Sequence, residues 1–366
     1  MAFIFQEMNH MDLKDLGWKD FFQEQMDSLE LEGVFPGRVA RTGPGILGLL
    51  TEEGEIEARV SGRLKQKSVS SSELPGIGDW VLYKPLETGN MVFLVLERTS
   101  KISRKVPGKG LEEQLIAANV DLIFVVMGLD DDFNLRRLER YLTMISGSGA
   151  SPAVLLNKSD LVNEDDKRVL EAEEICGEVP LIKISALGKK GLDAVEDLIQ
   201  KGRTISLVGS SGAGKSTLIN SLIGNQVQRT GEVREDDSKG RHVTTSRELF
   251  LLPGGGLIID NPGMRELQLW GDTTSLESAF PEIAELSPNC RFRDCRHESE
   301  PGCAVRMALE NRELDENRYH SYQKLRRELE VLSIKSDIGS EAMKKKKWKN
   351  IKKGIKGYYK FKKEGR

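Results

Sequence analysis

Hydrophobic residues occur along the chain in two different patterns, and the change falls near residue 110. Between residues 33 and 104 they form five short runs separated by Gly, Pro and acidic residues: "GRVARTG", "GILGLLT", "EIEARVSG", "GDWVLYKP" and "MVFLVLERTS". Runs of this length and spacing are typical of β-strands joined by turns. Five of them fit a small β-barrel of the OB-like kind. The strand pattern alone does not distinguish a structural barrel from a ligand-binding one.

Beyond residue 110, apolar strands alternate with helical segments. "DLIFVVMGL" is typical of a buried strand, and it is followed by a helix with Leu135, Leu138, Leu142 and Ile145 on one face. Four further strands run directly into loops, in "SPAVLLNKSDL", "PLIKISALG", "RTISLVGSSGAGKS" and "GGLIIDNPG". This alternation predicts a parallel α/β sheet. Because ligands bind at the carboxyl ends of such strands, the four loops are predicted to share one binding edge.

The loop "GSSGAGKS" has the form G-x-x-x-x-G-K-S in the strand–loop–helix context of a P-loop. Glycines allow backbone N–H groups to approach phosphate oxygens, Lys215 would contact the outer phosphates, and Ser216 would bind Mg²⁺. The predicted phosphate-binding residues are Gly209, Ser210, Ser211, Gly212, Ala213, Gly214, Lys215, Ser216 and Thr217.

An earlier loop, Asn157-Lys158-Ser159-Asp160, has the form NKxD. The Asp160 carboxylate can accept two hydrogen bonds from guanine, from N1–H and from the 2-amino group. Adenine offers neither donor, so it would leave the carboxylate unpaired. Ser185 and Ala186, about 25 residues later, resemble the loop whose backbone supports guanine in GTPases, and their spacing from NKSD favours guanine binding. The alternative for NKSD itself is an Asn/Asp turn that caps a helix.

The last strand ends in Asp260-x-x-Gly263, which predicts a carboxylate near Mg²⁺ and an N–H that reaches the γ-phosphate. "GRHVTT" precedes it, and Thr244 or Thr245 is the candidate switch-I ligand of Mg²⁺. Met264 stands where many GTPases have the Gln that orients water. We therefore expect slow intrinsic hydrolysis. His242 is the polar candidate for a catalytic role, unless it is an ordinary exposed loop residue.

These motifs come in an unusual order, with the two base-binding loops before the phosphate-binding loop and the switches. A circular permutation explains this order, since termini can be relocated when the sheet is kept. The predicted fold class is multidomain α/β. It comprises an N-terminal extension (1–32), an OB-like barrel (33–104), a circularly permuted P-loop GTPase domain (105–285), a helical zinc-binding domain (286–335) and a basic tail (336–366).

Three of the four cysteines lie within fourteen residues and share that segment with a histidine. The set is Cys290, Cys295, His297 and Cys303. Three thiolates and one imidazole at short spacing predict a closed, structural Zn²⁺ site. Unmetallated thiols are the alternative. Cys176 is isolated and is expected to be a core residue.

Charge is distributed unevenly, although the whole chain carries only −3. Residues 343–366 hold eleven Lys, one Arg and one Glu, a net +11, which leaves −14 for the rest. Aromatic residues lie among these lysines, so the tail favours an RNA partner, with a solvated tail or an anionic membrane surface as alternatives. No apolar run approaches the roughly 20 residues needed to span a bilayer. A cytoplasmic, monomeric protein is expected.

The combination of motifs resembles the ribosome-small-subunit-dependent GTPase A family of circularly permuted GTPases. The resemblance covers roughly residues 33–330 and rests on "AANVDLIFVV", "DDFNLRRLERYL", "NKSD", "SSGAGKST", "GRHVTT", "DNPGMREL" and the Cys/His cluster. It implies hydrolysis of GTP to GDP and phosphate, stimulated by the small ribosomal subunit, with rRNA binding in late maturation of that subunit. It also implies one structural zinc, Mg²⁺ bound with GTP, and His242 as a catalytic participant.

Two features depart from the family pattern. Val243 replaces the first of three switch-I threonines, which bears on the assignment to Thr244 or Thr245. The tail lies beyond the matched region. Two alternatives stay open: a non-hydrolysing RNA-binding scaffold with a structural nucleotide, and an ATP-dependent kinase, against which NKSD argues.

Overall fold

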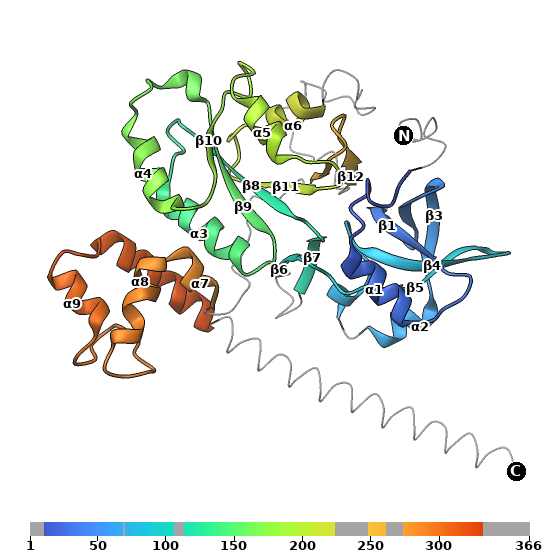
Figure 1. Cartoon of the computed structure of the whole chain (residues 1–366), viewed down its shortest axis with the longest axis horizontal. Helices are drawn as coiled ribbons and strands as arrows, with labels where there is room; N and C mark the ends of the chain where they lie inside the picture. Colours follow the sequence, from blue (N-terminus) through green and yellow to red (C-terminus); the bar gives the residue numbers. More distant parts are fainter. Residues whose placement is uncertain (1–10, 69, 106–112, 224–247, 261–273, 332–366) are drawn as a thin grey trace, which may run out of the picture. The chain divides into compact units, whose positions relative to one another are not determined.

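The computed structural model describes residues 11–68, 70–105, 113–223, 248–260 and 274–331 (Figure 1). They form two compact units, one built from residues between 11 and 260 and the other from residues 274–331. The five predicted domain boundaries stay a prediction. Within the described ranges no helix combines the length and apolar character needed to cross a bilayer.

The first five strands close into a barrel, as the five apolar runs predict. They are β1 (Phe35–Thr42), β2 (Leu47–Thr51), β3 (Gly54–Val60), β4 (Trp80–Leu86) and β5 (Gly89–Val95). Their order is β1-β2-β3-β5-β4, and β4 pairs with β1 to complete the ring. Every residue of β2 is buried. Helix α1 (Asp20–Ser28) precedes the barrel, and α2 (Gly62–Lys67) and the short η1 (Ser71–Glu73) lie between β3 and β4.

A parallel sheet forms the rest of the first unit, as predicted from the alternating pattern. Its strands are β8 (Leu122–Gly128), β9 (Ser151–Asn157), β10 (Leu181–Lys183), β11 (Thr204–Val208) and β13 (Leu257–Asp260), in the order β10-β9-β8-β11-β13. The short strands β6 (Lys101–Lys105), β7 (Glu113–Ala118) and β12 (Glu248–Leu251) were not predicted. β12 runs antiparallel to β13 and also pairs with β1, so the sheet continues into the barrel.

Helices pack against this sheet because its strands are apolar along most of their length, and every residue of β8 is buried. Leu122, Phe124 and Val126 point from β8 into one buried cluster with α5 (Leu192–Leu198) and α6 (Lys215–Ile223). Helix α3 (Leu135–Ser146) contacts β8, β9 and α4 (Lys167–Cys176). Asn134 caps α3, since its side chain accepts a hydrogen bond from the Arg137 N–H. A separate two-stranded sheet of β6 and β7 precedes β8.

The second unit is helical. It contains α7 (Thr274–Ala279), α8 (Pro281–Leu286), the 3-10 turn η4 (Ser287–Asn289), α9 (Ala304–Glu310) and a helix over residues 316–331. Phe280 is fully buried, with its ring centroid 5.6 Å from that of Tyr322. The Arg318 guanidinium lies 4.6 Å from the Phe280 ring and forms an ion pair with Glu282 at 2.8 Å. These contacts hold the C-terminal helix against α8.

A buried arginine joins three parts of the first unit. Arg38 of β1 is 1% exposed, and its guanidinium donates to the carbonyls of Leu16, before α1, and of Asn119, before β8. The guanidinium also lies 5.6 Å from the Trp80 ring. Burial lowers the pKa of Arg38 to about 10, so the side chain stays charged at neutral pH. The segment before the barrel, the barrel and the start of β8 are therefore held by one side chain.

Replacing Arg38 with Met should destabilise the first unit by about 2–4 kcal/mol, because the buried carbonyls lose a charged donor. Guanidinium denaturation, followed by fluorescence of the adjacent Trp18 and Trp80, measures this effect. Arg59→Met, at an exposed position of β3, is the matched control and should change stability by less than about 0.5 kcal/mol. Equal midpoints for the two variants would contradict the role assigned to Arg38.

Candidate nucleotide site and metal centre

The four predicted loops all follow strands of the parallel sheet. NKSD follows β9, the Ser185-Ala186 loop follows β10, the P-loop follows β11, and Asp260 is the last residue of β13. The strands are parallel, and β8 lies between β9 and β11. Their carboxyl ends therefore bring together loops that are far apart in the sequence.

Asn157 connects three of these loops through its side-chain amide. The side chain is 3% exposed. Its Nδ2 donates to the Ala213 carbonyl in the P-loop at 2.8 Å, and its Oδ1 accepts from the Ala186 N–H at 2.9 Å. A buried amide with both ends paired has one preferred orientation. Asn157 therefore fixes the base-binding loops against the phosphate-binding loop.

Gly214 lacks a side chain where the Asn157 amide approaches. A Cβ at Gly214 would lie 2.1 Å from Asn157 Nδ2, and the φ of 92° also favours glycine. Gly214, the third glycine of the P-loop, is thus required by contact with NKSD as well as by the predicted close approach of phosphate.

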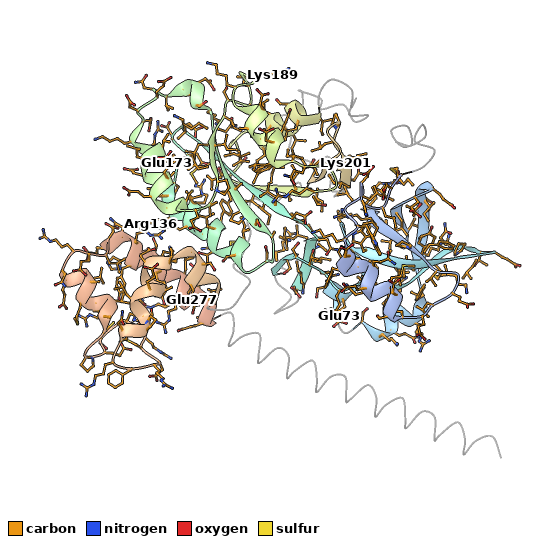
Figure 2. All side chains as sticks on the ribbon, in the orientation of Figure 1. Glu73, Arg136, Glu173, Lys189, Lys201 and Glu277 are labelled. Atoms are coloured by element: carbon orange, nitrogen blue, oxygen red, sulfur yellow. The ribbon has the colours of Figure 1, made fainter. Side chains whose placement is uncertain are left out.

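Asp160 lies at the surface, while the residues that support it are buried. Asp160 is exposed within the 3-10 turn η2 (Ser159–Leu161), and Ser185 is completely buried. A hydrogen bond from the Ser185 side chain lowers the pKa of Asp160, which keeps the carboxylate ionised and able to accept. After Ser185 and Ala186, their loop continues through exposed residues to Lys189 (Figure 2).

The P-loop lysine bonds to its own loop. Lys215 Nζ donates to the carbonyls of Gly209 at 2.7 Å and Ser210 at 2.5 Å. The lysine amine therefore lies inside the loop, where phosphate oxygens would be bound. Ser211, Ser216 and Thr217 are exposed around it, and their side chains are accessible to a nucleotide.

Two acidic residues of this edge were missed as site residues. Asp132 accepts a hydrogen bond from the Ser210 hydroxyl and forms an ion pair with Arg137 at 2.8 Å. Asp130 is paired with Lys158 of NKSD. The Ser210 bond lowers the pKa of Asp132, and the Lys158 bond lowers the pKa of Asp130. The available signal was "LDDDFN" directly after β8, on the same edge as the predicted loops.

Asp260 faces a second carboxylate across the sheet. Its partner in the register of β12 and β13 is Glu248. Burial raises the pKa of Glu248, Arg41 of the barrel lowers it, and the carboxylates of Glu55 and Asp260 raise it further. Of the remaining predicted residues, His242, Thr244, Thr245 and Gly263 lie outside the described residues, as do Met264 and the tail of residues 343–366.

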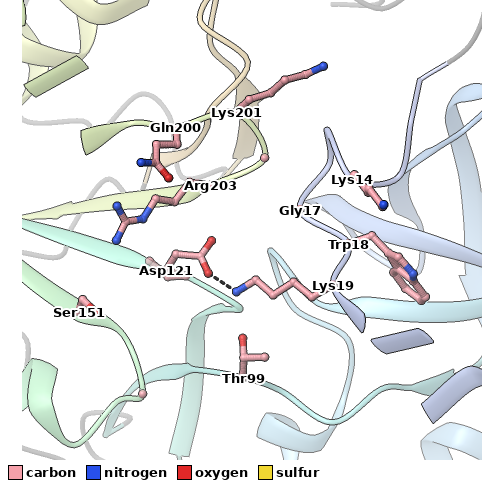
Figure 3. A pocket seen from close by; sticks show the side chains of 13 residues that line it. Lys14, Gly17, Trp18, Lys19, Thr99, Asp121, Ser151, Gln200, Lys201 and Arg203 are labelled. Carbon is pink, nitrogen blue, oxygen red and sulfur yellow. Dashed lines mark hydrogen bonds and ion pairs between the residues drawn. The ribbon is translucent and has the colours of Figure 1, made fainter. Parts of the chain in front are cut away.

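A pocket of about 480 Å³ lies at the opposite edge of the sheet (Figure 3). Lys14 and Lys19 line it from before α1, and Asp121, Ser151 and Arg203 line it from the amino ends of β8, β9 and β11. Lys19 and Asp121 form an ion pair across it. None of the residues predicted to bind nucleotide lines this pocket.

In the second unit, the predicted cysteine and histidine ligands converge. The ligand atoms of Cys290, Cys295, His297 and Cys303 all lie within 4.8 Å of one another. Tetrahedral coordination with metal–sulfur bonds of about 2.3 Å places two sulfurs about 3.8 Å apart. The Sγ atoms of Cys290 and Cys303 are 3.9 Å apart, and His297 Nδ1 lies 3.6 Å and 3.4 Å from them. These spacings and the donor set fit Zn²⁺.

Burial shifts the pKa values of two of the four candidate ligands. Burial raises the pKa of Cys295 to about 12 and lowers the pKa of His297. The histidine is therefore neutral, as a ligand must be, while the thiolates need a nearby cation. The C-terminal helix holds the loop, because the Tyr319 hydroxyl donates to the His297 carbonyl, and Gln323 Nε2 donates to the Arg296 carbonyl at 3.1 Å.

Ser287 determines which histidine nitrogen is free. The Ser287 hydroxyl donates to the Ile283 carbonyl at 2.7 Å, so its oxygen can accept from His297 Nε2–H at 3.2 Å. The proton then belongs to Nε2, and the Nδ1 lone pair points at the cysteines. Outer contacts of this kind orient metal ligands and raise their basicity.

Ser287→Ala should weaken Zn²⁺ binding about tenfold, because the imidazole loses its orienting partner. Competition with a chromogenic chelator measures the affinity. Ser299→Ala, at an exposed serine of the same loop, is the matched control and should bind Zn²⁺ like the unmodified chain. Equal affinities for both variants would show that Ser287 has no such role.

Comparison with known proteins identifies the family. Residues 95–270 match the RsgA GTPase family. The chain is 45% identical to "Small ribosomal subunit biogenesis GTPase RsgA" of Opitutus terrae, covering 94% of this chain and 97% of that protein. A protein of the same name from Methanosarcina acetivorans is also 45% identical, with 89% of this chain and 88% of that protein covered.

Two solved structures are similar in fold. The crystal structure of YjeQ from Thermotoga maritima has a TM-score of 0.63 at 28% identity, covering 81% of this chain and 98% of that one. YloQ, described as a circularly permuted GTPase, has a TM-score of 0.60 at 25% identity, covering 82% and 97%. The chain therefore belongs to the RsgA GTPase family of circularly permuted, GTP-hydrolysing enzymes.

Proposed function

We propose that this GTPase acts in late maturation of the small ribosomal subunit, binding rRNA and hydrolysing GTP to GDP and phosphate when the subunit stimulates it. The observation that carries the nucleotide site is the Asn157 side chain, which joins NKSD, the Ser185-Ala186 loop and the P-loop. The relatives named for biogenesis of the small ribosomal subunit support the partner.

Base selection is assigned to Asp160. Its carboxylate is exposed and its pKa is lowered, so it is ionised and available to the N1–H and 2-amino donors of guanine. Adenine would leave it without either bond, which costs affinity. Ser185 and Ala186 support the base through backbone and side-chain contacts to Asn157 and Asp160.

Phosphate and Mg²⁺ are assigned to the other half of the edge. Lys215 would exchange its bonds to loop carbonyls for bonds to the outer phosphates. Ser216 and Asp260 would hold Mg²⁺, together with Thr244 or Thr245, and Gly263 would contact the γ-phosphate. Mg²⁺ supplies charge neutralisation at the phosphates. His242 remains the proposed catalytic participant.

RNA binding is assigned in part to the loop that the metal would hold. Arg291, Phe292 and Arg293 lie between the first two cysteines, and all three are exposed. The Arg291 guanidinium lies 5.6 Å from the Phe292 ring. Guanidinium groups neutralise phosphates, and an exposed ring can stack on a base. The lysine-rich tail would add charge to the same interaction, and a monomer stays our expectation.

Asp160→Asn should lower GTP affinity at least about tenfold, because the asparagine amide cannot accept both guanine hydrogen bonds. Xanthosine triphosphate should regain affinity for this variant, since its 2-oxo group accepts from the new amide. Fluorescence competition measures both constants. Asp165→Asn, at an exposed carboxylate of the next loop, is the control. Unchanged GTP affinity would remove the assignment of base selection.

Phosphate release from GTP should rise strongly when purified small ribosomal subunits are added, and ATP should give none. Arg291→Gln/Arg293→Gln should raise the subunit concentration needed for half-maximal stimulation, without changing the maximal rate. For this double variant, the slope of log affinity for the subunit against log salt concentration should become less steep by about 2, because two phosphate contacts are removed.

Arg312→Gln, exposed after α9, is the matched control for the loop variant. Slow release that subunits do not stimulate would leave the nucleotide site standing and count against this partner. No release under any condition would favour a scaffold with a static nucleotide.

A further inference from the structure

A row of charged residues crosses the sheet from the nucleotide edge into the barrel. In antiparallel strands, directly opposite residues place their side chains side by side on one face. Glu248 of β12 is opposite Asp260 of β13, and Arg41 of β1 is opposite Glu248. Asp260, Glu248 and Arg41 therefore form a continuous row over three strands.

The row continues across the barrel strands. Arg41 Nε donates to Glu55 Oε1 on β3 at 2.7 Å, and its Nη2 also bonds to this oxygen. To reach β3, the guanidinium passes over β2 at Gly48, the residue opposite Arg41. A Cβ at Gly48 would lie 3.1 Å from Arg41 Nε and 3.0 Å from Glu55 Oε1. The absence of a side chain at Gly48 leaves room for the link.

Arg41 therefore acts on two carboxylates of this row, on Glu55 through hydrogen bonds and on Glu248 through its charge. Glu248 is half-buried between Asp260 and Arg41, so its charge acts on both neighbours. Negative charge at Glu248 favours a divalent cation beside Asp260, and the positive charge of Arg41 opposes it. Attraction to Arg41 favours the ionised form of Glu248, because it lowers the pKa of this carboxyl.

We propose that Arg41 is a positioning residue for the Mg²⁺·nucleotide site, acting on Asp260 through Glu248, and that it links nucleotide binding to the barrel. The inference rests on the proposed function, because it requires Mg²⁺ beside Asp260. Arg41 restrains Glu248 and thereby weakens Mg²⁺ binding. A shift of Asp260 on nucleotide binding changes the charge interactions along the row as far as β1. By linkage, a change at β1 alters nucleotide binding by the same free energy.

The test is a Mg²⁺ titration of the binding of a fluorescent GTP analogue, with the full chain. Arg41→Gln should lower the Mg²⁺ concentration for half-maximal effect about threefold, and Glu248→Gln should raise it about threefold. The double variant should return close to the unmodified chain. Arg41→Lys keeps the charge and should shift the midpoint less than Arg41→Gln does. Arg59→Gln removes an exposed barrel charge outside the row and should have no effect.

The opposite signs separate this proposal from structural damage. If both single variants weakened Mg²⁺-dependent binding, or if neither changed it, the proposal would be overturned. Should Glu248→Gln fail to fold, the direction of the Arg41→Gln shift decides alone, and only a lower midpoint supports the link. An unmodified chain that binds no GTP with Mg²⁺ would overturn both this inference and the proposed function. Normal binding with unmoved midpoints overturns the inference only.

Discussion

The first unit depends on the acceptors of one buried guanidinium. Arg38 belongs to the barrel, but two of its carbonyl partners lie outside it, at Leu16 and Asn119. A buried charge without its partners costs several kcal/mol, so moving Leu16 or Asn119 away from Arg38 would be strongly unfavourable. Asn119 strengthens the joint, since its side chain donates to the Gly78 carbonyl and accepts from the Thr99 N–H. The start of β8 is thereby fixed to the barrel, and β8 is the central strand of the nucleotide edge.

Circular permutation leaves this edge intact because its geometry depends on strand neighbours and not on chain order. β9 precedes the predicted base-binding loop, β11 precedes the predicted phosphate-binding loop, and both strands flank β8. Asn157 then connects the two loops directly, over a separation of 56 residues from Ala213. In an unpermuted domain the same contact would join the loops from the other direction along the chain. The permutation changes which segments are adjacent to the termini, and it leaves the contacts that build the edge unchanged.

Sequence predicted those features whose cause is local. Five apolar runs became the barrel strands, Leu138 and Leu142 lie on the buried face of α3, and the cysteine and histidine ligands converge. The missed features leave no periodic or motif signal in the sequence. Arg38 in a strand pattern suggests an exposed side chain, since its acceptors are 22 and 81 residues away. β12 is four residues long, too short for a periodic signal. Ser287 carries no pattern that connects it to His297. The role of each predicted nucleotide-binding residue stays a prediction.

The position of the barrel follows from the properties of β12. Without a neighbour, β12 would be the edge strand of the α/β sheet, with unpaired backbone groups that invite association. β1 pairs with it at Arg41 and Glu248, so the barrel covers this edge. β12 comes directly after the predicted switch-I segment and pairs with β13, which ends in Asp260. Covering the edge therefore places the barrel against the strand that lies, along the chain, between the predicted switch-I segment and Asp260. The pairing that covers the edge strand thus also gives the barrel contact with β12, whose other neighbour is the strand that ends in Asp260.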